Sequence, residues 1–133
     1  MIPDVTGLEY DELTTADGQC YMRRYYLERT RQGEKRYHHI LMSDQDRDMH
    51  DHPWNFQSTI LHGSYLETTP DGANRYQAGD IITRTAGQPH RLELTEPVWT
   101  YIKTGPFVKT WGFHTPNGWV DWRRYRATPS RNW

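Results

Sequence analysis

His50-Asp51-His52-Pro53-Trp54 is the stretch from which the fold and the function of this chain are inferred. Alternate residues of a β-strand point to the same side, so His50 and His52 present two imidazoles to one face. Two neutral imidazoles at that spacing suit one ion of iron, zinc, copper, nickel or manganese. An H-x-H pair also occurs in ordinary solvated loops, so by itself it is a weak signal. A third ligand has to come from elsewhere in the chain, and His90 is the best candidate.

The composition describes one domain with a balanced charge. The chain has 133 residues, enough to bury a core of its own. Hydrophobic residues make up 35% of it, and six Trp, nine Tyr and three Phe add large areas that can be buried. The net charge is -1, with 16 basic and 17 acidic residues. This balance gives no reason to expect nucleic acid or an anionic membrane as a partner.

Cysteine content and terminal signals bear on the compartment. Cys20 is the only cysteine, so neither an internal disulfide nor a thiolate metal cluster can form. The sequence does not begin with a charged segment followed by an apolar run, as a secretory signal does. No apolar stretch approaches the ~18 residues that cross a bilayer. We therefore expect a cytoplasmic protein.

Short strands separated by turn residues are predicted along most of the chain. The strands are expected at residues 19–29, 36–43, 55–66, 75–77, 80–84, 91–94, 98–103, 107–114 and 119–122. The longest, 55–66, contains Gly63, where a bend is expected. Residues 1–18 are expected to form a turn-rich cover of one edge, and the segment from Arg123 onward to be partly loose. Because no segment has a convincing helical period, the pattern predicts an all-β antiparallel sandwich or barrel.

Two segments of the chain resemble the two motifs of the cupin superfamily, G-x5-H-x-H-x3,4-E-x6-G and G-x5-P-x-G-x2-H-x3-N. The matching residues are His50, His52 and Gly63 in the first motif, and Gly79, Gly87 and His90 in the second. The stretch that includes the histidine pair, together with residues 111–119, also resembles small bacterial and phage cupins, a group that brings no reaction with it. Two motifs at the correct internal spacing are much more specific than the histidine pair alone.

This resemblance implies a single-domain, cupin-type jelly-roll β-barrel over residues 1–133, with the motif core at about 37–114. It also implies one divalent metal ion bound by His50, His52 and His90. Fe(II) is the preferred ion, with Zn, Ni or Mn as alternatives.

The glutamate of the first motif has no counterpart here. The motif spacing puts Phe56 or Gln57 at its position, and strand parity relative to His52 favours an inward-pointing Phe56. Asp51 is the nearest carboxylate, but a regular strand points it away from the metal. We expect it to hydrogen-bond a loop or a ligand imidazole instead. The resemblance therefore implies three histidines and no carboxylate at the metal.

The expected site favours an enzyme. Three neutral ligands leave the ion its full charge and up to three open positions, which suits a bidentate small-molecule substrate together with O2. By resemblance to other three-histidine cupins, the preferred function is an iron-dependent dioxygenase, a metal-dependent oxidoreductase. One alternative is a non-catalytic cupin module that binds a metal or a small metabolite. Another is a cupin isomerase or epimerase that acts on a sugar derivative, with His114 or a tyrosine as the acid/base.

His114 is the candidate catalytic residue outside the two motifs. It follows Gly112, which would let a ligand or another backbone approach closely. The functional interpretation places His114 in the pocket as an acid/base or hydrogen-bond donor. The alternative is a histidine that caps the barrel mouth through a hydrogen bond. Arg84 and Lys103 are candidates to bind an anionic substrate, although solvated strand faces carry most such residues.

Other histidines and tryptophans are expected to have structural roles. His38, His39 and His62 lie within strand patterns. Three tryptophans near the end of the sequence are expected to seal the barrel or a homodimer interface, because aromatic residues are common at interfaces: Trp119, Trp122 and Trp133.

Overall fold

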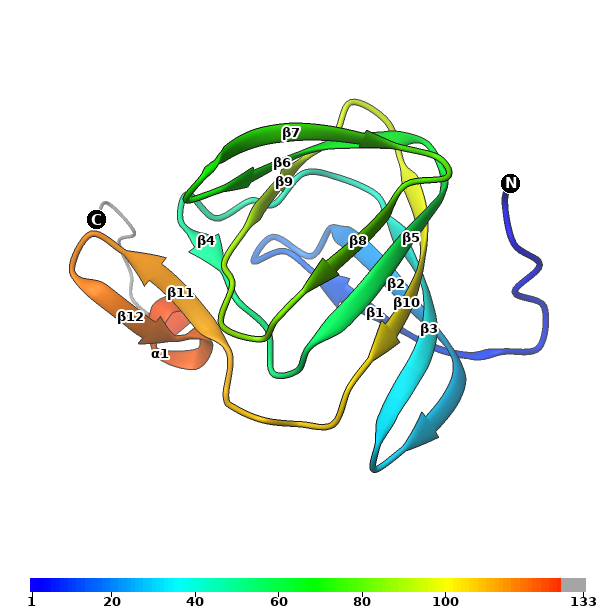
Figure 1. The fold of residues 1–133 in the computed structure, drawn as a ribbon, viewed down its shortest axis with the longest axis horizontal. Coiled ribbons are helices and arrows are strands. Elements are labelled where there is room, and N and C mark those ends of the chain that lie inside the picture. Colours follow the sequence, from blue (N-terminus) through cyan, green and yellow to red (C-terminus); the bar gives the residue numbers. More distant parts are fainter. Residues whose placement is uncertain (128–133) are drawn as a thin grey trace.

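Strands paired antiparallel, and one short helix, make up residues 1–127, the part of the chain that the computed structural model describes (Figure 1). The strands are β1 (Glu9–Thr14), β2 (Cys20–Thr30), β3 (Gly33–Ile40), β4 (Met49–His50), β5 (Phe56–His62), β6 (Ser64–Thr69), β7 (Gly72–Gln77), β8 (Ile81–Arg84), β9 (Arg91–Glu93), β10 (Val98–Thr104), β11 (Gly112–Thr115) and β12 (Gly118–Asp121), and the helix is α1 (Trp122–Ala127). The predicted all-β antiparallel class is confirmed.

The strands form one large and two small sheets. The six-stranded sheet has the order β1-β2-β3-β10-β5-β8, and the small sheets have the orders β7-β6-β9 and β12-β11-β4. In Figure 1 the large sheet and the β7-β6-β9 sheet enclose the centre of the molecule, with β11, β12 and α1 to one side next to β4. Neighbouring strands in the large sheet are mostly far apart in sequence, as in the β3–β10 and β10–β5 pairs.

The core is built from the side chains that point inward at every second position of the strands. Along β5, Phe56, Ser58 and Ile60 are buried while Gln57 is exposed. The central apolar cluster takes residues from several strands of both enclosing sheets: Ile40, Ile60, Tyr65, Ile82 and Val98. Because side chains alternate between faces with a period of two, one face of each strand is committed to this core.

Two expected boundaries were wrong, each for a local reason. The 55–66 strand is broken at Gly63, which has φ 88° and separates β5 from β6. The 107–114 strand begins only at Gly112, and Phe107 and Val108 are exposed before it. Of the segment from Arg123 onward that was expected to be partly loose, residues 123–127 belong to α1, and the rest lies outside the described residues.

Both ends of the described chain form regular secondary structure. The expected edge cover contains β1, which pairs with β2 at the end of the large sheet. Helix α1 is held by Tyr125, which is fully buried and stacks on Phe113 with ring centroids 3.8 Å apart. Within residues 1–127, no helix is long and apolar enough to cross a membrane.

Candidate metal site

Backbone pairing brings the two histidine motifs together. The amide of His50 donates to the carbonyl of His90, and the amide of His90 donates to the carbonyl of His50, both at 2.9 Å. The amide of His52 donates to the carbonyl of Ala86 at 3.0 Å, which ties the turn before His90 to the first motif. Residues directly opposite in an antiparallel pair have side chains on the same face, so this pairing aligns the two motifs.

The three imidazoles form a compact group. Ring centroids lie 5.0 Å apart for His50 and His52, and 4.8 Å apart for each of the two pairs that include His90. The ring planes meet at 67°, 77° and 88°, so the rings are close to mutually perpendicular. One nitrogen from each ring lies within 4.8 Å of the others. The structure therefore brings the three predicted ligands together in an arrangement that can hold a metal ion.

Burial keeps two of these rings neutral. Removal from water lowers the pKa of His50 to about 4, although the nearby Asp44 carboxylate acts in the opposite direction. Burial also lowers the pKa of His52 well below its usual value, and the neighbouring His90 and His50 add to the effect. A neutral imidazole is the form that donates a lone pair to a metal, so no proton has to be removed near neutral pH.

The surroundings of His52 fit a metal ligand better than a structural histidine. Its Nδ1 is buried and has no hydrogen-bond partner among the described residues. Phe56 lies against the ring with centroids 4.5 Å apart, and Trp54 stacks on it at 5.8 Å. The predicted inward orientation of Phe56 is confirmed, and Gln57 is exposed on the opposite side of β5. The position of the missing motif glutamate is therefore apolar.

Glu67 supplies the carboxylate of the site from a different strand. It lies on β6, is 1% exposed, and its Oε2 is 2.8 Å from Nδ1 of His90. A carboxylate on Nδ1 fixes the ring orientation and leaves Nε2 available to an ion. Burial raises the pKa of Glu67, but the hydrogen bonds from His90 and Arg84 outweigh it and the net pKa is below the usual value. Glu67 is therefore an anion that orients His90, a candidate metal ligand.

The sequence interpretation did not assign this role to Glu67. The expected strand stopped at Leu66, so Glu67 was left next to a loop. In the structure β6 continues to Thr69, and Tyr65 and Glu67 both face inward. A single continuous strand would have turned Tyr65 and Glu67 outward, opposite to Phe56 and Ile60, and the break at Gly63 is what turns them inward.

Arg84 forms an ion pair with Glu67 and also donates to the hydroxyl of Tyr76 at 3.4 Å. The sequence had suggested Arg84 as a residue that binds an anionic substrate. In the structure its guanidinium is already engaged by the Glu67 carboxylate. Lys103 is exposed, with its ammonium 5.9 Å from the ring of Tyr101. That ring lies on the face of β10 opposite the core.

Asp51 organises the other side of the histidine strand. It is 2% exposed and accepts hydrogen bonds from Lys109 Nζ at 2.7 Å, the Gly112 amide at 2.8 Å, and His114 Nε2 and Trp119 Nε1 at 3.0 Å each. Burial raises its pKa, but these donors outweigh it and the net pKa is lowered. As expected, Asp51 points away from the histidine cluster and hydrogen-bonds a neighbouring segment.

The structure does not bring His114 to the three histidines. In the register of β11 with β4, His50 is opposite Phe113 and His114 is opposite Met49. Phe113 therefore shares the face of His50, with ring centroids 6.3 Å apart, whereas His114 lies on the other face beside Asp51. The catalytic assignment of His114 stays a prediction, but its hydrogen bond to Asp51 fits the alternative structural role. The expected close approach at Gly112 is made by another backbone, at Val120.

The C-terminal tryptophans lie around the same unit. Trp119 is partly exposed and donates to Asp51, and Trp122 stacks on Trp111 with ring centroids 5.7 Å apart. Trp133 lies outside the described residues. The homodimer interface expected from these aromatic residues stays a prediction.

An antiparallel barrel with converging histidines defines a cupin fold with a candidate metal site. No family model matches the chain, and no curated protein matches it in sequence. A cupin-2 domain protein of Rhodospirillum rubrum superposes with a TM-score of 0.68 at 15% identity, covering 93% of this chain and 84% of that chain. An RmlC-like cupin of Shewanella frigidimarina superposes with a TM-score of 0.60 at 13% identity, covering 75% of this chain and 85% of that chain.

HppE in its Fe(II) form is a third structural neighbour. It superposes with a TM-score of 0.62 at 13% identity over 78% of this chain, and the match spans 59% of the length of HppE. Similarity at these identities establishes the fold but not the function, because one fold can host many unrelated functions. The chain has the cupin fold, and the jelly-roll class expected from the two motifs is confirmed.

Proposed function

We propose that this protein is a metal-dependent oxidoreductase that binds one divalent ion on His50, His52 and His90 and acts as a dioxygenase on a small molecule. The observation that carries the proposal is the convergence of three imidazoles within 4.8 Å. Burial favours the neutral form of two of these rings, and Glu67 orients the third. A structural cluster of histidines needs none of these features.

Different residues have different roles at the proposed site. Glu67 holds the His90 ring through Nδ1, so Nε2 is the nitrogen that faces the other ligands. Phe56 and Trp54 cover His52 and exclude water from that side. Because all three ligands are neutral, an ion keeps its charge for an anionic oxygen donor of the substrate. A bound redox-active ion supplies Lewis acidity and electron transfer to O2.

Iron is the first ion to test. Three imidazoles suit several transition metals, and a site of this kind does not select among them by affinity alone. The HppE structure contains Fe(II), which supports testing that ion before Zn, Ni or Mn.

Elemental analysis of purified protein followed by oxygen-electrode measurements tests the proposal. Wild type should retain a stoichiometric ion, and the Fe(II) form should consume O2 only when a substrate from a panel of small organic acids and thiols is added. His90→Ala should lose the ion, whereas His62→Ala, at an exposed position outside the cluster, should retain it. Retention of zinc or nickel without O2 uptake would favour the binding-module or isomerase alternatives. The isomerase needs an acid/base near the ligands, and a tyrosine would have to supply it if His114 keeps its place on the other face of β11.

A further inference from the structure

Two buried polar side chains face each other on the inner wall of the barrel, outside the site described so far. His38 on β3 is directly opposite Thr100 on β10, and the two residues are 9% and 1% exposed. They lie beside Ile60, which is opposite Thr100 on the other neighbouring strand. Neither Nε2 of His38 nor Oγ1 of Thr100 has a hydrogen-bond partner within residues 1–127.

Such a pair is unusual in a native core. A buried polar atom without a partner forfeits its hydrogen bonds with water, and most buried side-chain donors and acceptors are therefore paired. Two adjacent unpaired groups on the same face are readily explained if they serve a ligand that enters the barrel. An apolar pair of the same shape would satisfy the fold better.

The inner face of β3 connects the pair with the surroundings of the histidine cluster. His38 and Arg36 are both buried on that face of β3, two residues apart. Arg36, on the same face of β3, has its guanidinium 5.2 Å from the centre of the Trp54 ring, and Trp54 stacks on His52. The inner face of β3 therefore passes close to a predicted metal ligand.

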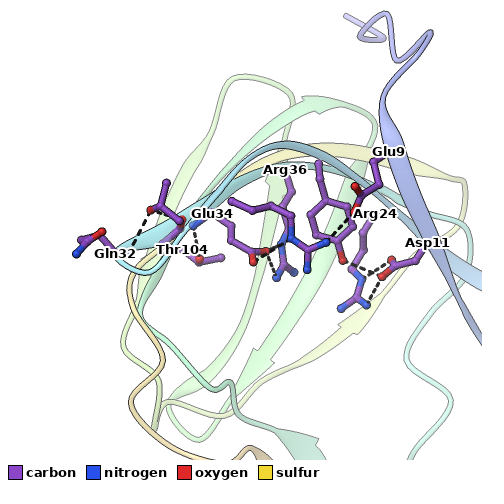
Figure 2. A network of polar contacts seen from close by, with 11 residues as sticks. Glu9, Asp11, Arg24, Gln32, Glu34, Arg36 and Thr104 are labelled. Atoms are coloured by element: carbon purple, nitrogen blue, oxygen red, sulfur yellow. Dashed lines mark hydrogen bonds and ion pairs between the residues drawn. The ribbon is translucent and has the colours of Figure 1, made fainter.

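The charges around His38 are compensated. Arg36 pairs with Glu34 at 2.6 Å, and Arg24, which is opposite His38 on β2, pairs with Asp11 at 2.8 Å (Figure 2). Burial together with these two guanidinium groups lowers the pKa of His38 well below its usual value. His38 and Thr100 therefore present a neutral imidazole and a hydroxyl, and each of the two nearby guanidinium groups is paired with a carboxylate. Such a site suits a neutral oxygen, since burying a further charge there would be costly.

We propose that His38 Nε2 and Thr100 Oγ1 form a polar subsite that hydrogen-bonds a neutral hydroxyl or carbonyl group of the small molecule held at the three-histidine site. This inference rests on the proposed metal site, because the ion would bind the anionic end of the same molecule. The ligand class is a small hydroxy acid, whose carboxylate would bind the ion while a second oxygen would bind His38 and Thr100. The pair acts as a specificity determinant for that second oxygen.

Calorimetric titration of the zinc-loaded protein tests the subsite without oxygen chemistry. The probes are 2-hydroxy acids with a terminal hydroxyl on carbon 3, 4 or 5, each compared with the matching acid that lacks it. At least one hydroxylated acid should bind wild type about two- to twelvefold more tightly than its partner, the range expected for one net hydrogen bond. Thr100→Val and His38→Phe should abolish that preference and leave binding of the partner acid unchanged. The matched control is Thr59→Val, on the outward face of β5, which should keep the preference.

Unfolding of the metal-free variants gives an independent measurement. Thr100→Val should raise the urea midpoint relative to wild type, because the substitution removes a buried hydroxyl without a partner. A lowered midpoint would show that the hydroxyl is satisfied in the free protein and would overturn the proposal. So would the absence of a preference for any hydroxylated acid in protein that retains zinc. Failure of wild type to retain any metal would instead remove the proposed function together with this inference.

Discussion

Replacing Glu67 by glutamine should weaken metal binding about ten- to a hundredfold, the range typical for loss of a group that orients a ligand histidine. Glu67 is 1% exposed, and its Oε2 is 2.8 Å from Nδ1 of His90. Glutamine keeps the size of the side chain and an acceptor oxygen but removes the negative charge. The His90 ring then loses its charge-assisted hydrogen bond, and with it part of its fixed orientation and its basicity.

The expected loss corresponds to about 1.4 to 2.7 kcal/mol of binding free energy. A second effect comes from Arg84, which loses the carboxylate that it pairs with in a largely buried position. That loss should lower the free energy of unfolding of the metal-free protein by about 1 to 3 kcal/mol. The two effects are separable, because binding is measured under conditions in which both proteins remain folded.

Competition with a chromophoric chelator at neutral pH measures the metal affinity, and urea unfolding of the metal-free protein measures the stability. Glu93→Gln is the matched control, because Glu93 lies on neighbouring β9 and forms an exposed ion pair with Arg91 at 2.6 Å. That variant should bind the ion as wild type does. If Glu67→Gln also bound the ion within twofold of wild type, the proposed role of Glu67 in orienting His90 would have to be abandoned.

Three further predictions concern stability. The free energy of unfolding of the metal-free protein should fall by about 2 kcal/mol between pH 7 and pH 5 because of His50 alone, since the ring stays neutral in the fold. The stability it adds is present above its unfolded pKa of about 6.5 and is lost as the pH falls towards the folded pKa of about 4. Urea unfolding at both pH values should show a smaller loss in His50→Gln, and an equal loss would refute the assignment. Asp51→Asn should lower the free energy of unfolding by about 1 to 3 kcal/mol, because its buried carboxylate accepts hydrogen bonds from four groups; exposed Asp71→Asn serves as the control, and equal stability of the two variants would contradict this role. Gly112→Ala should lower the free energy of unfolding by about 1 to 3 kcal/mol, since a Cβ there would lie 2.2 Å from a carbonyl oxygen of β12. The control is Gly87→Ala, whose Cβ would meet no atom within 4 Å, and thermal melts should show that this variant is as stable as wild type.

The two-residue period of a β-strand predicted several side-chain orientations at the site. The two-residue repeat of a strand placed His50 and His52 on one face, turned Asp51 to the other, and favoured Phe56 over Gln57 as the inward residue. The structure agrees with each of these orientations. His90 could be added because its motif spacing resembles that of cupins, and the backbone bridge with His50 explains how the two motifs meet.

Residues whose position depends on long-range pairing could not be placed in this way. Glu67 reaches His90 because β6 pairs with β9, and His114 faces away because β11 pairs with β4 in the observed register. A shift of one residue in that register would have turned His114 towards the ligands. Helix α1 likewise has no convincing period in its six residues and depends on Tyr125 packing against Phe113.

The order of residues along the chain was enough to predict the side-chain alternation, the antiparallel class and the three histidines that are candidates for one metal. Strand pairing was needed to show which carboxylate contacts His90, which face His114 occupies, and that His38 meets Thr100 inside the barrel. The physical reason is that the direction of a side chain follows from its own backbone, with a period of two residues. Which strands become neighbours, and in which register, depends on burying the whole core at once.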